Sequence, residues 1–179
     1  MREILKLGGK LLLLTAVAGL ALGLTNAITK GPIEEQAVAA ANAARQTVLG
    51  GAETFEQVLE NENGMDEIHR GLDASGNVVG YTGKITTRGY GGPIEVTVGV
   101  DAEGKLAGIQ CGGSGFSETA GLGAKVKTAA FSDQFAGLAT PVALTKDGGE
   151  VDSVTAASIS SGAVCNAVNI AAEYIAGLA

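Results

Sequence analysis

Residues 94–113, IEVTVGVDAEGKLAGIQCGG, carry the clearest structural pattern in the chain. Every second residue of the first half is β-branched: Ile94, Val96, Val98 and Val100. This period of two is typical of a strand with one buried face. Residues 101–104 suit a turn, and Leu106 and Ile109 belong to a returning strand. The sequence therefore predicts an antiparallel β-hairpin here.

The same stretch contains the spacing of a phosphate-binding loop, G-x-x-x-x-G-K, at residues 99–105. The next residue is Leu106, where such a loop needs Ser or Thr, and the motif lies within a hairpin instead of opening a helix. A nucleotide-phosphate loop is therefore excluded.

The segments on either side of this hairpin predict an α+β fold. Residues 71–89 predict a second hairpin with its turn at residues 74–77, and residues 55–64 a short helix or irregular segment. Residues 30–50 predict a helix with Pro32 in its first turn, and residues 131–135 a short helix. Residues 142–144 and 149–152 are short strand candidates. From Ser158 onward a last helix is expected, with apolar residues at helical spacing: Ile159, Ala163, Val164, Ala167, Val168, Ala171, Ala172 and Ile175.

The N-terminus has the pattern of a membrane anchor. Arg2, Lys6 and Lys10 precede a predominantly apolar run, residues 11–28, which spans about 27 Å as a helix. The basic residues precede the run and Glu34 and Glu35 follow it, so the positive-inside rule places the N-terminus in the cytoplasm. We expect a cytoplasmic N-terminus at 1–10, a transmembrane helix at 11–29 and one extracytoplasmic domain at 30–179. A cleaved signal peptide is the alternative, although no small-x-small cleavage site follows Ile28.

Charge and composition exclude several classes of function. The formal net charge of −7 argues against nucleic-acid binding, which needs clustered Lys and Arg. The single histidine, His69, is expected on the surface, and the two cysteines match no metal-site spacing. Cys111 and Cys165 are expected to be buried thiols, with a disulfide as the alternative.

Residues 151–168, VDSVTAASISSGAVCNAV, place several hydroxyls where the last helix begins. Thr155 or Ser158 could cap that helix, since Ser and Thr are preferred there. A helix N-terminus also favours a phosphate, and a hydroxyl at this place could carry one covalently. No base lies beside these hydroxyls to activate them.

This stretch resembles the signature of FMN-binding domains in which the flavin is attached through its phosphate to a hydroxyl side chain. Residues 89–101, GYGGPIEVTVGVD, and 118–125, ETAGLGAK, resemble two further blocks of that family, in the same order. With the anchor, the chain resembles the G-subunit family of Rnf electron-transport complexes, which is related to the C subunits of sodium-pumping NADH:quinone oxidoreductases.

The resemblance implies a set of cofactor-binding residues. Ser158 would carry the FMN, with Thr155 as the second candidate, and Ser160 would hold phosphate oxygens. Lys125 would add positive charge near the phosphate or the ring. The isoalloxazine would be lined by Glu118, Thr119, Gly121, Leu122 and Gly123. The chain departs from the family pattern in having Ala156 for Gly, Ser158 for Thr and Ala120 for Pro. An alanine at 156 would be unfavourable if its backbone needs a positive φ.

The function implied is an electron-relay subunit with one covalent FMN, in a membrane complex that couples ferredoxin and NAD to ion translocation. Its partners would be integral membrane subunits and other subunits of the complex. A separate flavin transferase, using FAD and Mg²⁺, would activate the hydroxyl. Two alternatives remain open: a stand-alone extracytoplasmic flavin domain, and a flavin-free anchored domain in which the hydroxyls only cap the helix.

Overall fold

The first helix, α1 (Arg2–Val48), is one continuous element of 47 residues. The structure is a computed structural model that describes residues 2–62 and 64–178, and the chain divides into two compact units after Asn42. Pro32 lies inside α1, so the expected separate helix beginning near residue 30 is wrong. Proline removes a single backbone hydrogen bond, and the alanine-rich sequence after it has high helix propensity, which favours continuation.

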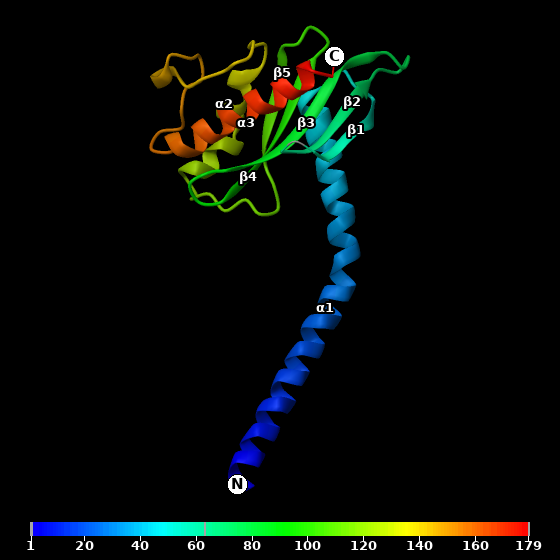
Figure 1. Ribbon diagram of the computed structural model, residues 1–179, viewed down its shortest axis with the longest axis vertical. Helices are drawn as coiled ribbons and strands as arrows, with labels where there is room; N and C mark the ends of the chain where they lie inside the picture. Colours follow the sequence, from blue (N-terminus) through cyan, green and yellow to red (C-terminus); the bar gives the residue numbers. More distant parts are fainter. Residues whose placement is uncertain (1, 63, 179) are drawn as a thin grey trace. The chain divides into compact units, whose positions relative to one another are not determined.

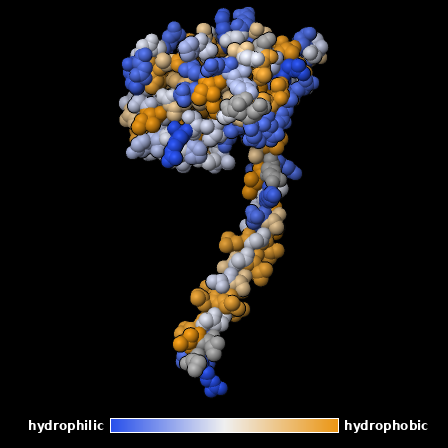
Figure 2. Space-filling view, viewed as in Figure 1, coloured by the Kyte–Doolittle hydropathy of each residue, from blue (hydrophilic) through white to orange (hydrophobic). Residues whose placement is uncertain are grey.

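The first unit contains a candidate membrane span. Within α1, an 18-residue window reaches a mean hydropathy of 2.0, and none of that window is buried against protein. Leu11 to Leu14 are 65–72% exposed. Figure 2 shows hydrophobic side chains along this helix. By length and composition, α1 is able to cross a bilayer.

The second unit is built on a five-stranded antiparallel sheet (Figure 1). Its strands are β1 (Thr54–Glu62), β2 (Met65–Leu72), β3 (Val78–Arg88), β4 (Pro93–Asp101) and β5 (Leu106–Gly112). They lie in sequence order, β1-β2-β3-β4-β5. Both expected hairpins, β2–β3 and β4–β5, are confirmed. The expectation for residues 55–64 is wrong, because this segment pairs with β2 as an edge strand.

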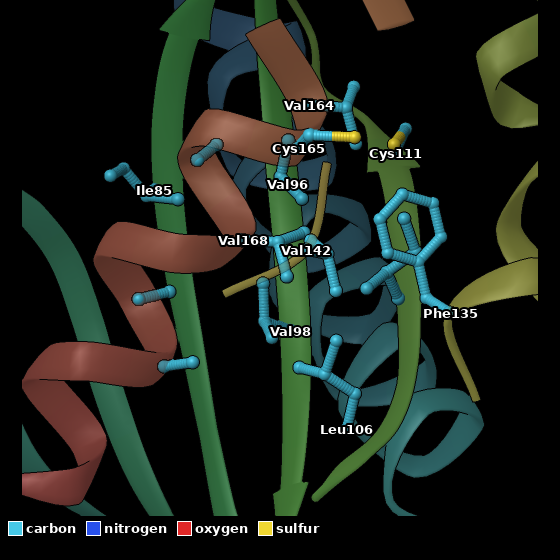
Figure 3. Packing of buried hydrophobic residues seen from close by; sticks show 14 of the residues in the cluster. Ile85, Val96, Val98, Leu106, Cys111, Phe135, Val142, Val164, Cys165 and Val168 are labelled. Carbon is cyan, nitrogen blue, oxygen red and sulfur yellow. The ribbon is translucent and has the colours of Figure 1, made fainter. Parts of the chain in front are cut away.

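Each face of the sheet is covered by a different part of the chain. The helix α3 (Ser158–Ala176) covers one face, where Val164 and Val168 pack against Val96 and Val98 (Figure 3). The end of α1 covers the other face, where a Cβ added at Gly99 would lie only 3.2 Å from the Cβ of Val48. The last helix is therefore confirmed, and the fold is α+β.

Short helical turns connect β5 to α3. They are η1 (Gly123–Lys127), α2 (Ala129–Ser132), η2 (Asp133–Phe135) and η3 (Thr145–Asp147). The expected helix near residues 131–135 corresponds to α2 and η2, where the rings of Phe131 and Phe135 meet edge-on at 5.5 Å. The two expected short strands reduce to one isolated bridge between Leu144 and Val151.

Cys111 and Cys165 are buried free thiols on β5 and α3 (Figure 3). Burial raises the pKa of Cys111 to about 12 and that of Cys165 to about 11. The expectation of buried thiols is confirmed. Among the described residues, no group of three or more His, Cys, Asp or Glu side chains could hold a metal ion.

An ionic cluster lies where the end of α1 meets the sheet. Glu67 accepts from Arg45 at 2.7 Å and from Lys84 at 3.0 Å. Burial raises the pKa of Glu67, but the Lys84 hydrogen bond and the Arg45 charge outweigh it and lower the value overall. His69 is only 8% exposed, so its expected surface position is wrong. It lies directly across from Thr82 in the β2–β3 pairing, in the part of the sheet that Arg45 approaches.

Candidate functional site

A tight turn, Val154 to Ala157, leads into α3. The N–H of Ala157 donates to the carbonyl of Val154 at 2.9 Å. The Ser161 hydroxyl accepts from the N–H of Val154 and donates to the carbonyl of Ala157, both at 3.0 Å. Ala156, the third residue of the turn, has a φ of +60°. The chain therefore enters α3 through a turn that a buried side chain of α3 itself holds closed.

The hydroxyls of Thr155 and Ser158 do not cap the helix. Ala157 occupies the N-cap position, and no side chain makes a capping hydrogen bond there. Ser158 is the first helical residue, and both it and Thr155 are exposed. Within residues 2–62 and 64–178, neither hydroxyl makes a side-chain hydrogen bond. The capping interpretation of these two residues is wrong.

A pocket of about 350 Å³ lies between the first turn of α3 and the loop that begins at Glu118. It is lined by Tyr90, Glu118, Thr119, Leu122, Gly123, Ala156, Ala157, Ser158, Ile159 and Ser160. Six residues expected at the cofactor site line it: Ser158, Ser160, Glu118, Thr119, Leu122 and Gly123. The fold thus brings together residues of two motif blocks, 118–125 and 151–168, that are separated in the sequence.

Glu118 lies at the floor of the site and is only 8% exposed. Its Oε1 accepts from the N–H of Gly91 at 2.9 Å, and its Oε2 accepts from the hydroxyl of Ser160 at 2.8 Å. Ser160 is fully buried. Glu118 and Ser160 were each expected to contact the cofactor, but in the structure they are hydrogen-bonded to each other.

Glycines surround the Glu118 carboxylate. A Cβ added at Gly123 would lie 2.9 Å from Glu118 Cδ and 3.0 Å from Ser160 Oγ. One added at Gly89 would lie 3.1 Å from the same Cδ. At Gly91 it would lie 2.6 Å from the carbonyl oxygen of Ser117. The backbone here approaches the carboxylate more closely than any side chain would allow.

Three expected site residues lie outside this pocket. Thr155 and Lys125 line a neighbouring hollow of about 240 Å³. Gly121 is exposed, with a φ of +78°, and does not line the pocket. Lys125 therefore lines the same hollow as Thr155 and does not line the pocket that contains Ser158.

Two large side chains at the rim were missed by sequence reasoning. Tyr90 is 74% exposed. The sequence could have indicated it, because it is an aromatic residue among the glycines of the 89–101 motif block. Ile159 was counted with the buried face of the last helix, but it is 59% exposed. It lies in the first turn, beside the pocket instead of over the sheet.

The pocket combines an apolar rim with a polar end. Tyr90, Leu122 and Ile159 are exposed apolar surfaces, whereas the first turn of α3 offers unpaired N–H groups and the positive end of the helix dipole. Among the described residues no Lys or Arg lines it. Such a site suits a ligand with a flat apolar part and an anionic group at the helix end.

Comparison with known proteins agrees with this geometry. The family model of the FMN-binding domain matches residues 89–173, which include every residue lining the pocket. The chain is 37% identical to the G subunit of the Na⁺-translocating ferredoxin:NAD⁺ oxidoreductase complex of Acetobacterium woodii, over 99% of this chain and 94% of that protein. It is 35% identical to the G subunit of the ion-translocating oxidoreductase complex of Methanosarcina acetivorans, over 97% and 95%.

Among solved structures, the chain is similar to the C subunit of the Na⁺-translocating NADH-quinone reductase of Parabacteroides distasonis. The match has a TM-score of 0.47 and 22% identity, and it covers 61% of this chain and 59% of that one.

Proposed function

The chain belongs to the G subunits of ion-translocating oxidoreductase complexes, and from that premise we propose that it relays electrons through an FMN covalently attached to Ser158. The observation that carries the proposal is the free Ser158 hydroxyl on the first turn of α3, at the edge of a pocket within the FMN-binding domain. When bound, FMN supplies the electron-transfer chemistry, and the protein supplies position and surroundings.

The residues of the pocket fit the two ends of a flavin nucleotide. At the polar end, the first-turn N–H groups of a 19-residue helix favour the phosphate. At the rim, the apolar surfaces of Tyr90, Leu122 and Ile159 would hold the flat aromatic ring and shield it from water. The volume of about 350 Å³ lies in the usual range for ligand pockets.

The charges around the pocket favour a covalent bond over reversible binding. No Lys or Arg among the described residues lines it, and its one charged side chain is the Glu118 carboxylate. The helix end is then the main stabilising charge for the phosphate, worth about 1 kcal/mol when exposed. A phosphoester at Ser158 would hold the flavin regardless of this weak attraction. Thr155 remains the second candidate, although it lines the neighbouring hollow with Lys125.

Attachment requires a base that the pocket does not offer. The two oxygens of Glu118 accept hydrogen bonds from Gly91 and Ser160, and in the described part of the chain neither is hydrogen-bonded to Ser158. A separate flavin transferase with Mg²⁺ would therefore take the Ser158 proton. The serine oxygen would attack the FMN phosphorus of FAD, and the bond to AMP would break, releasing AMP.

The relatives indicate the setting of this relay. The Acetobacterium woodii complex acts on ferredoxin and NAD⁺ and translocates Na⁺. We assign this chain to a complex of that kind, with other subunits as its immediate electron partners. The basic residues before the apolar run support a cytoplasmic N-terminus and an extracytoplasmic domain.

The test is covalent flavin on the peptide that spans residues 151–168. The full chain is co-expressed with a flavin transferase, and wild type, Ser158→Ala and Thr155→Ala are compared by intact mass and peptide mapping. We expect the FMN mass on wild type and Thr155→Ala, and its loss on Ser158→Ala. Loss on Thr155→Ala alone would move the bond to Thr155. An unmodified wild type, with the transferase active on a control substrate, would overturn covalent attachment.

A further inference from the structure

Glu118 joins three segments of the second unit through a single buried carboxylate. It lies in the loop before η1, accepts from Gly91 in the β3–β4 loop, and accepts from Ser160 in α3. These partners are 27 and 42 residues away in the sequence. A buried carboxylate is costly unless it is hydrogen-bonded, so the three segments are mutually dependent.

The link to Ser160 stabilises a helix end that has no cap. Ala157, at the N-cap, makes no side-chain hydrogen bond, and first helical turns without caps fray readily. Ser160 is the third residue of α3, two residues after Ser158 and in the same turn. Fixing Ser160 against Glu118 therefore fixes the position of the backbone that carries the Ser158 side chain.

Glycine backbone packs closely around the Glu118 carboxylate. Gly89 and Gly123 leave no room for a side chain beside it. Both oxygens of the carboxylate accept hydrogen bonds from other residues, and among the described residues none joins it to the Ser158 hydroxyl, so we assign it no role as a base there.

We propose that Glu118 is a positioning residue: it holds the first turn of α3 against the 118–123 loop so that Ser158 is presented for flavin attachment. The inference rests on the proposed attachment at Ser158. It assigns Glu118 a role through Ser160 and Gly91, in place of direct contact with the flavin ring.

The first experiment measures the rate of flavin attachment to the full chain in detergent, with purified transferase and saturating FAD. Glu118→Ala should be at least about tenfold slower than wild type, because both charge-assisted hydrogen bonds are lost. Glu118→Gln should stay within about threefold, because an amide can accept from Gly91 and donate to Ser160. Ser160→Ala should also be slow, and the double variant no slower than the slower single one.

A matched control separates positioning from general loss of stability. Val168→Ala shortens a fully buried core residue of α3, away from the pocket. It should lower the urea concentration at which the protein unfolds and leave the attachment rate near wild type. Equal rates for Glu118→Ala and wild type would overturn the inference. So would a Glu118→Gln variant as slow as Glu118→Ala, since charge rather than position would then be required.

A second measurement needs no flavin. Hydrogen exchange of the apo protein follows the amides of Gly91 and Ser161, which donate to Glu118 and to the Ala157 carbonyl. We expect the protection factors of these two amides to fall at least about tenfold in Glu118→Ala and to stay at the wild-type level in Glu118→Gln. Unchanged protection in Glu118→Ala would overturn the inference on its own. A wild type that takes up no flavin would overturn the attachment step, while this exchange result still decides whether the carboxylate holds the turn.

Discussion

Ala156 adopts a left-handed backbone conformation, φ +60°, at the entrance to the proposed attachment site. The resemblance to FMN-binding domains placed a glycine at this position, and a positive φ is what glycine accepts without strain. An alanine here costs about 1–2 kcal/mol. The turn is kept closed by its backbone hydrogen bond and by Ser161.

Ala156→Gly should therefore stabilise the protein. Relief of the left-handed conformation outweighs the greater freedom of glycine in the unfolded chain, leaving a gain of about 1 kcal/mol in the free energy of unfolding. Urea denaturation of wild type and variant checks this. Ala163→Gly, inside α3 and without a positive φ, is the control and should destabilise by about 1 kcal/mol, because glycine there relieves no strain. A less stable Ala156→Gly would contradict the strain assigned to this residue.

His69 should make stability depend on pH. Burial and the Arg45 charge lower its pKa below the ordinary value near 6.5, against smaller opposing effects of Glu67 and Glu60; Lys84 acts with Arg45. Below about pH 6.5 the unfolded chain binds a proton that the folded chain does not. The free energy of unfolding should thus fall as pH falls from 6.5 toward 5.5, and be level above.

The measurement is urea denaturation at pH 7.5, 6.5 and 5.5 for wild type and His69→Gln. The variant should lose most of the decline between pH 6.5 and 5.5. An equal decline in both proteins would assign the effect to carboxylates instead. His69 also shows a limit of sequence reasoning: an isolated histidine gives no periodic signal, and its burial follows from the end of α1 covering that part of the sheet.

At the residue scale, the motifs predicted six of the residues that line the pocket and missed two residues of its rim, Tyr90 and Ile159. Glu118, Leu122, Gly123 and Ser158 were predictable because two motif blocks lie together in the fold that they imply. Tyr90 and Ile159 were not, since exposure of a loop aromatic and of a first-turn residue depends on where the helix ends relative to the sheet.

At the scale of elements, the strongest periodic patterns gave correct structure and the weak ones did not. Alternation in β4 and the turn after it predicted the β4–β5 hairpin, and the apolar stripe predicted α3. The edge strand β1 was missed because its sequence, TFEQVLENE, lacks a buried alternation and depends on pairing with β2. Pro32 suggested a helix start that the surrounding helix formers override.

The contact between the end of α1 and the sheet predicts different effects for alanine substitutions at two paired glycines, Gly99 and Gly108. A Cβ at Gly99 would lie 2.7 Å from the carbonyl carbon of Val48, whereas one at Gly108, its cross-strand partner, would lie 3.5 Å from Val48 Cα. Gly99→Ala should destabilise by about 2 kcal/mol or more through overpacking. Gly108→Ala should change the free energy of unfolding by less than about 1 kcal/mol, because the added methyl makes ordinary contact. Denaturation of both variants checks this, and equal effects would contradict the close approach.

At the scale of the whole chain, the last residues of α1 belong to the domain. Val48 and Leu49 are 2% and 4% exposed, and Arg45 pairs with Glu67. The division after Asn42 is therefore the place to separate the candidate membrane span from the domain. A sequence-based boundary at residue 30 lies within continuous helix, because composition marks the end of the apolar run but not where tertiary packing begins.

A fragment of residues 43–179 should be soluble without detergent and unfold in one cooperative transition. A fragment of residues 53–179 should be less stable by at least about 3 kcal/mol, since it leaves the face under Val48 and Leu49 uncovered. Circular dichroism during urea denaturation compares the two. Equal stability would mean that the end of α1 contributes nothing to the core.

The strands lie in the sheet in the order in which they are synthesised, and this order sets when the pocket can form. All five strands pair with their neighbours in the chain, and α3 is synthesised after every one of them. All strand pairings can therefore begin to form before Ser158, the proposed acceptor, has been synthesised. Glu118 can form its hydrogen bond with Ser160 only once α3 has packed on the sheet, and only then does the Ser158 hydroxyl reach its position beside the pocket. A chain interrupted before residue 154 has all five strands but lacks both Ser158 and the helix that covers one face of the sheet. If the flavin is attached at Ser158 as proposed, covalent flavin on this protein would report that α3 is in place.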